Sequence, residues 1–212
     1  MAAFRRTALR SAGAATLLVA GVVSLALAAQ GSGDSHATDR GVRIAEASGG
    51  AAFARLVVAA APKSWKSATI ASGGASLFYP SSWKPLPGDS GTVTVALRDV
   101  RGLYHGYLNV TPRQGAERLT GWAPFRTRRN TEEGDRQTRI VAAVEGLRFA
   151  RSHGSCVIDD YLSRVGSHAY RELACIVAGS HYTNVFVGAT LLADWPTLGP
   201  VIERSASVLA ER

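Results

Sequence analysis

Two cysteines, Cys156 and Cys175, are the only ones in the chain, and they constrain its fold more than any other feature. Both lie in segments with the composition of β-strands, 155–164 and 169–178. Between these segments, Val165-Gly166 suits a two-residue turn. A hairpin with that turn places Cys156 directly opposite Cys175, where suitable Cβ geometry allows a disulfide. The sequence therefore predicts a disulfide that fixes the register of a central hairpin.

The same register pairs other side chains across the two strands. Asp160 falls opposite Arg171, which predicts a cross-strand ion pair, and Tyr161 falls opposite Tyr170 as an aromatic pair. A turn shifted by one residue, with Gly166-Ser167 at its apex, would break the cysteine pair and both of these pairs. The register is therefore a single prediction with three parts.

The N-terminus has the parts of an export signal. Arg5, Arg6 and Arg10 form a basic start, residues 12–30 carry no charge, and Ala26-Leu27-Ala28 suits cleavage by a signal peptidase. The apolar core is short, which favours a cleaved signal peptide over residues 1–29. The alternative is an uncleaved membrane anchor through residues 12–30, since that stretch is long enough to cross a bilayer. Both interpretations place the rest of the chain outside the cytoplasm, secreted or anchored at the outer face of the cytoplasmic membrane. An oxidising compartment also suits the predicted disulfide.

The remaining chain divides into a spacer and one domain. Residues 30–67 begin with a Gly-, Ser- and Asp-rich stretch. A short helix over 51–61 that ends at Pro62 is predicted next, with a strand as the alternative for the same residues. Residues 68–212 form a single α+β domain, an antiparallel sheet of about six strands flanked by helices. Asp194 is the predicted N-cap of the last helix, and Gly146 a predicted bulge. Predicted strands cover 75–79, 92–98, 104–111, 138–149, 155–164, 169–178 and 182–191; predicted helices lie within 117–135 and after Asp194.

The formal net charge of +8 does not indicate nucleic-acid binding. The densest basic segment, 113–139, is interrupted by acidic residues and has no RNA-binding motif or zinc-ligand spacing, so a solvated helix face is the simpler interpretation. One part of this segment combines aromatic and arginine side chains, which are typical of protein interfaces. Large aromatic side chains are mostly buried, so packing in the core or at element ends is expected for the tryptophans in general. Trp122 is the best candidate for an exposed contact, and we predict that this segment contacts a partner through it. The predicted contact residues are Trp122, Phe125, Arg126, Arg128 and Arg129.

Catalytic signatures are absent from the sequence. No nucleophile elbow, zinc-protease helix, phosphate-binding glycine loop or calcium loop is present, and the five histidines, His36 included, have no ligand spacing. We accordingly predict no catalytic residue, cofactor or metal. A small extracytoplasmic hydrolase remains the alternative, and it requires at least two ionisable side chains to converge in one pocket. The side chains available for that role are His105, His153, His168, His181, Asp159, Asp160 and Glu172.

Short motifs in the domain resemble the PsbP-like superfamily, which includes small exported actinobacterial proteins of the LpqN type. The run Leu77-Phe78-Tyr79-Pro80-Ser81-Ser82-Trp83 resembles the "F-x-Y-P-x-x-W" opening of that superfamily. The segments 109–112, 156–161, 170–175 and the closing helix at Trp195-Pro196 are similar too. The resemblance implies an antiparallel sheet sandwiched by helices. It also implies a binding or assembly role without catalysis, while partners differ between branches of the superfamily.

These observations lead to one preferred function. The sequence predicts an exported, non-enzymatic binding or accessory protein of the cell envelope, whose partner is an unknown protein or an envelope component. A purely structural, membrane-anchored envelope protein is a further alternative. The preferred hypothesis predicts a groove or apolar patch on one face of the sheet or around Trp122, without converging ionisable groups.

Overall fold

The structure, a computed structural model, describes residues 52–211. The predicted signal peptide at 1–29, the anchor alternative at 12–30 and most of the spacer lie outside these residues. No helix within 52–211 is both long and apolar enough to cross a membrane. The strands are β1 (Trp65–Thr69), β2 (Ala75–Pro80), β3 (Lys84–Leu86), β4 (Val93–Arg98), β5 (Tyr104–Pro112), β6 (Arg136–Arg148), β7 (His153–Leu162), β8 (Ala169–Ala178), β9 (Thr183–Leu191) and β10 (Ala210–Glu211). The helices are α2 (Trp122–Glu132), the short 3₁₀ turn η1 (Leu192–Asp194) and α3 (Trp195–Ser207).

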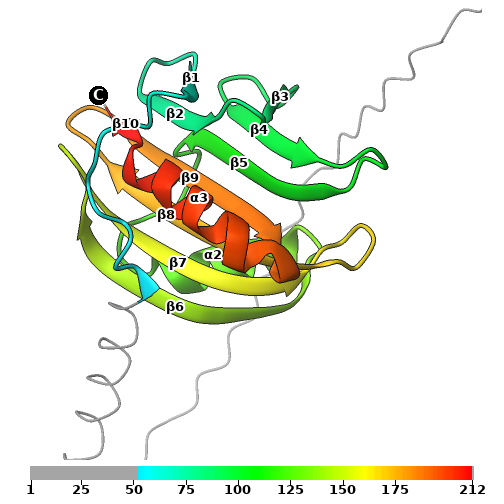
Figure 1. Ribbon diagram of the computed structural model, residues 1–212. Coiled ribbons are helices and arrows are strands. Elements are labelled where there is room, and N and C mark those ends of the chain that lie inside the picture. Colours follow the sequence, from blue (N-terminus) through cyan, green and yellow to red (C-terminus); the bar gives the residue numbers. More distant parts are fainter. Residues whose placement is uncertain (1–51, 212) are drawn as a thin grey trace, which may run out of the picture. The chain divides into compact units, whose positions relative to one another are not determined.

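Seven of the strands form one antiparallel sheet in the order β3-β4-β5-β9-β8-β7-β6 (Figure 1). Strands β6 to β9 are a meander, in which each strand pairs with the next one along the chain. The β4–β5 hairpin joins this meander because β5 pairs with β9, a contact between segments far apart in the chain. A separate three-stranded sheet has the order β1-β2-β10. The α+β prediction is confirmed.

The two faces of the large sheet carry different side chains, because successive residues of a strand point to opposite sides. In β5, Leu108 and Val110 are fully buried on one face, where they share a core with Phe186 and with Ile202 of α3. On the other face, Trp122 of α2 packs against residues of β7, β8 and β9. Helices therefore cover both faces of the sheet (Figure 1).

The predicted hairpin register is confirmed in all three parts. Cys156 lies opposite Cys175, Asp160 opposite Arg171 and Tyr161 opposite Tyr170. The cysteines form a disulfide with a Cα–Cα distance of 4.1 Å. The Asp160 carboxylate accepts hydrogen bonds of 2.7 and 3.0 Å from the Arg171 guanidinium.

The turn of this hairpin differs from the predicted Val165-Gly166 pair. The strands end at Leu162 and begin again at Ala169, and the Ser163 N–H donates to the His168 carbonyl across a longer loop. Gly166 and Ser167 both have positive φ, of 77° and 53°. Glycine adopts this left-handed region without strain. The loop is symmetric about the predicted turn, which is why the register survives the error.

Removing the disulfide is expected to lower the free energy of unfolding by about 3 kcal/mol, because its loop spans 19 residues. Both cysteines are buried beside apolar side chains, so a Cys156→Ala/Cys175→Ala variant avoids placing hydroxyl groups in the core. Urea denaturation with and without dithiothreitol measures the effect. Reductant should destabilise the wild type by the same amount and leave the variant unchanged. A wild type that is insensitive to reductant while unfolding would contradict the prediction.

The segment before β2 and the short strand β3 differ from the sequence predictions. The described part of the helix predicted over 51–61 is helical only at Ala52, and a turn at 53–55 and irregular chain follow. Phe53 and Leu56 nevertheless pack into the core, and β1 begins at Trp65, before the predicted domain boundary at residue 68. The short strand β3 was not predicted, because three residues containing Pro85 carry no periodic signal.

Asp194 occupies the N-cap position of α3 but makes no side-chain cap hydrogen bond. Its carboxylate instead lies 2.6 Å from Nδ1 of His105, on β5. The Asp194 carboxylate therefore bonds to the distant His105 instead of to the backbone N–H groups at the start of α3, which the sequence predicts as its partners. The bulge at Gly146 is present, with φ of 73° and a register shift between Val144 and Leu147.

The turn after β2 buries Trp83. The Trp83 N–H donates to the Pro80 carbonyl, and only 3% of the residue is exposed. Its ring lies against Gly106 of β5, where an added Cβ would come within 2.9 Å of the indole. Glycine at position 106 is therefore needed for this close packing.

Candidate functional site

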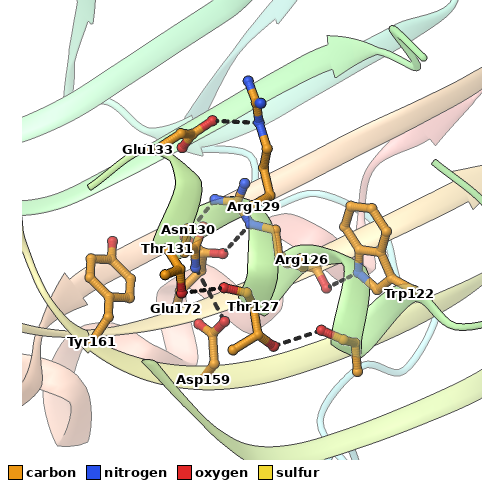
Figure 2. A network of polar contacts seen from close by, with 12 residues as sticks. Trp122, Arg126, Thr127, Arg129, Asn130, Thr131, Glu133, Asp159, Tyr161 and Glu172 are labelled. Carbon is orange, nitrogen blue, oxygen red and sulfur yellow. Dashed lines mark hydrogen bonds and ion pairs between the residues drawn. The ribbon is translucent and has the colours of Figure 1, made fainter. Parts of the chain in front are cut away.

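Helix α2 is the element around which the polar side chains of the molecule gather. It begins after Gly121 and ends before Gly134, both of which have positive φ. Trp122, Arg126 and Asn130 follow one another at intervals of four residues, so all three project from the same side of the helix. That side faces the sheet, and each of the three side chains bonds to a residue of β7 or β8 (Figure 2).

Trp122 anchors the first turn of the helix. Its indole Nε1–H donates to the Ala174 carbonyl at 2.9 Å, and its ring lies 5.9 Å from that of Phe125 in a stacked arrangement. Only 2% of Trp122 is exposed. The prediction of Trp122 as an exposed contact is therefore wrong. Burying the large ring stabilises the docking of α2 more than exposure would.

Arg126 forms a two-point ion pair with Glu172 of β8. Arg126 Nε lies 2.6 Å from Oε1, and Nη2 lies 2.9 Å from Oε2. The Glu172 side chain is almost completely buried, and that of Arg126 mostly so. Burial disfavours the charged guanidinium, but the adjacent Glu172 carboxylate outweighs it, so the pKa of Arg126 is raised. The pair holds α2 to the sheet and leaves neither charge without a partner.

A second buried carboxylate, Asp159, lies directly opposite Glu172 across β7 and β8. Asn130 Nδ2 donates to its Oδ2 at 3.2 Å (Figure 2), whereas Oδ1 is buried without a hydrogen-bond partner among the described residues. Burial, with a further contribution from the Glu172 charge, raises the pKa of Asp159 to about 8. Asp159 is therefore a neutral acid at pH 7, and the Arg126 guanidinium pairs with Glu172 rather than with Asp159.

Two tyrosine hydroxyls border this cluster. The Tyr107 hydroxyl lies 3.5 Å from Glu172 Oε2 and 3.5 Å from the hydroxyl of Tyr161. Burial raises the pKa of both phenols, so they stay protonated. The polar cluster consists of Tyr107, Arg126, Asn130, Asp159, Tyr161 and Glu172.

Beside α2 runs a groove of about 650 Å³, named here the α2 groove. Strands β4, β5 and β9 form its floor, which mixes the polar side chains of Thr94, Asn109 and Thr111 with the apolar Val185 and Val187. Residues of α2, including Phe125 and Arg129, line one wall, and the loop from Gln114 to Glu117 lines one end. The groove exists because α2 covers only part of its face of the sheet. Its volume falls in the range of ligand pockets.

The five predicted contact residues fall into two groups in the structure. Trp122 and Arg126 are buried against the sheet, although both also border the groove. Arg128 and Arg129 are largely exposed: Arg128 lies over the Phe125 ring, and Arg129 pairs with Glu133 at 2.9 Å. This outer side of α2 is the solvated, mixed-charge helix face that the sequence predicts. Phe125 and Arg129 remain available for contact at the groove wall, and Arg128 lies outside the groove.

The ionisable residues that the hydrolase alternative needs are mostly dispersed. His105 pairs with Asp194, His168 lies in the β7–β8 loop, and Asp160 pairs with Arg171 and Arg139. Asp159 and Glu172 do converge, but both are buried and neither lines one of the pockets described here. Within 52–211 no three His, Cys, Asp or Glu side chains are grouped so as to hold a metal ion. His36 lies outside the described residues.

Comparison with known proteins identifies the fold. The chain is similar to the solution structure of the cyanobacterial PsbP protein, CyanoP, of Synechocystis sp. PCC 6803, with a TM-score of 0.51 and 19% identity over 71% of this chain and 94% of that one. The described part of the chain therefore has a PsbP-like fold, as the sequence motifs imply.

Two further structures align over a similar length with lower scores. They are a Pseudomonas aeruginosa protein of unknown function (TM-score 0.45, 12% identity, 70% of this chain and 97% of that one) and LpqN, involved in cell envelope biogenesis of Mycobacterium tuberculosis (0.41, 10%, 69% and 89%). No family model and no curated protein matches the sequence.

Proposed function

We propose that this protein is an exported binding or accessory protein of the cell envelope, without catalytic activity, and that it holds a protein partner or an envelope component in the α2 groove. The observation that carries the proposal is the groove itself. It offers hydrogen-bonding and apolar side chains on a floor of three strands. Its acidic and basic wall residues are paired with one another rather than directed at a reacting centre.

The polar cluster beneath α2 supports this proposal because it fixes the groove wall before any partner arrives. The Trp122 indole, the Arg126–Glu172 ion pair and the Asn130–Asp159 hydrogen bond attach three successive turns of the helix to the sheet. A wall held in this way has little conformational freedom to lose on binding, which favours affinity.

Two features support export. The Cys156–Cys175 disulfide joins the central strands, and such structural disulfides form and persist in oxidising compartments. The basic and apolar N-terminus precedes a site suited to cleavage. Expression of the full chain followed by fractionation and intact-mass measurement tests both. A cytoplasmic product with free thiols would contradict the proposal.

Site-specific photo-crosslinking in cells tests the role of the groove. A photoreactive phenylalanine analogue at Thr94, on the groove floor, is expected to yield a discrete adduct with a partner. The matched control is the same substitution at Thr69, which is exposed on β1 in the other sheet and should yield none. Equal adducts at both positions, or an adduct only at Thr69, would overturn the assignment of the groove.

A further inference from the structure

A second pocket, of about 470 Å³, lies at the end of the sheet next to the β7–β8 loop. Four tyrosines from three strands line it: Tyr104 and Tyr107 of β5, Tyr161 of β7 and Tyr170 of β8. We refer to it as the tyrosine pocket. It adjoins the α2 groove only at Tyr107, which borders both.

The tyrosine rings are held in fixed positions. Tyr161 and Tyr170 form the predicted cross-strand pair, with centroids 5.9 Å apart and planes only 16° from parallel. The Tyr170 hydroxyl donates to the Tyr104 carbonyl at 2.7 Å, and the Tyr107 hydroxyl is directed at Tyr161 and Glu172. The rings thus offer preorganised aromatic surface, while Tyr104, 37% exposed, stands at the rim.

The charge of the lining is unusual for this chain, which has a formal net charge of +8. Among the described residues that line the tyrosine pocket there is no lysine or arginine; Asp135 is the one carboxylate and His168 the one histidine. Asp135 is half-buried after the end of α2, where its Oδ1 accepts a hydrogen bond from the Arg164 backbone N–H. Aromatic ring faces attract cations, and a carboxylate at the edge of the pocket adds to that attraction.

From this combination we propose that the tyrosine pocket binds an organic cation, namely an alkylated ammonium group such as a trimethylammonium head. In this proposal the tyrosine side chains contact the alkyl groups, and Asp135 balances the charge. The Tyr104 ring already contacts a cation in the structure, because the Arg98 guanidinium lies 5.4 Å from its centroid. Arg98 itself does not line the pocket. This site is independent of any partner in the α2 groove.

Calorimetric titration of the purified disulfide-bonded protein with choline tests the proposal. The matched ligand is 3,3-dimethyl-1-butanol, which has the same shape as choline without its charge. Choline is expected to bind at least about tenfold more tightly than this neutral alcohol. Equal affinities would show a simple apolar pocket and would overturn the proposal, as would failure of choline to bind.

Two variants locate the binding site. Asp135→Asn keeps an oxygen for the Arg164 N–H and removes the charge, so choline affinity should fall about fivefold while that of the neutral alcohol does not change. Tyr104→Leu, at the rim, should also weaken choline binding about fivefold. The control is Glu117→Gln, the same loss of charge in the α2 groove, and it should have no effect. Choline binding that is unchanged in both pocket variants, each shown to be folded by its melting curve, would place the site elsewhere and overturn the proposal.

Discussion

Replacing Arg126 by methionine is expected to lower the free energy of unfolding by about 3–5 kcal/mol, the usual cost of breaking a buried ion pair on one side. Methionine retains most of the apolar stem but leaves the Glu172 carboxylate buried without its guanidinium. The indole hydrogen bond of Trp122 would then be the main attachment of α2 to β8. Urea denaturation followed by circular dichroism measures the change.

Two variants separate the buried pair from general effects on α2. Arg129→Met, one turn nearer the C-terminus, removes an exposed ion pair with Glu133 and should cost less than about 1 kcal/mol. The double variant Arg126→Met/Glu172→Gln removes both charges and should recover a large part of the loss, because an uncharged amide costs less to bury than an unpaired carboxylate. If Arg126→Met and Arg129→Met were equally mild, the ion pair would not hold the helix.

Asp159→Asn is expected to stabilise the protein by roughly 5 kcal/mol at pH 8 and by almost nothing at pH 4. The native carboxyl keeps its proton up to about pH 8, whereas in the unfolded chain it ionises near pH 4. Between these values the unfolded state releases a proton that the folded state retains, so the free energy of unfolding of the wild type falls as the pH rises. Asparagine cannot ionise, can still accept the hydrogen bond from Asn130, and removes this pH dependence. Denaturation curves at pH 4, 6 and 8 provide the measurement.

Asp160, next to Asp159, provides a control whose effect on the free energy of unfolding changes with pH in the opposite direction. Burial tends to raise the pKa of Asp160, but hydrogen bonds from Arg171 and Arg139 outweigh it and lower that pKa. The stabilisation from Asp160 is present above the pKa of an unfolded aspartate and is lost as the pH falls through the lower folded value. Asp160→Asn should therefore destabilise the protein at pH 8 and become neutral in strong acid. A wild type with no fall in stability between pH 4 and 8 would contradict the buried-acid assignment for Asp159.

The hairpin shows how far local patterns can predict this fold. Strand alternation and one turn placed Cys156, Asp160 and Tyr161 opposite their partners, because the register of an antiparallel hairpin depends only on residues near each other in the sequence. The same register also places Asp159 opposite Glu172, a signal present in the sequence. Two carboxylates on directly opposite strand positions need a nearby cation or a shared proton when they are buried. This pair is therefore the sequence signal for the polar cluster.

Local sequence patterns do not predict that Arg126 is the cation that pairs with Glu172. Arg126 lies 46 residues before Glu172, and nothing in an amphipathic pattern says which face of which strand a helix will cover. For the same reason Trp122 was predicted as exposed: its arginine-rich neighbours indicate a solvated helix, but the ring lies on the opposite side of that helix, against β7, β8 and β9.

By itself the sequence determined seven of the strands, helices α2 and α3, the hairpin register, the disulfide and the α+β class, since all of these follow from residue periodicity and short-range pairing. The tertiary structure decided the pairing of β5 with β9, the docking of α2 over the two carboxylates, and thereby both the α2 groove and the tyrosine pocket. These features join residues that are distant in the chain. Their positions depend on which apolar surfaces and charged side chains pack against each other in the folded protein, and no local segment of the sequence determines those contacts.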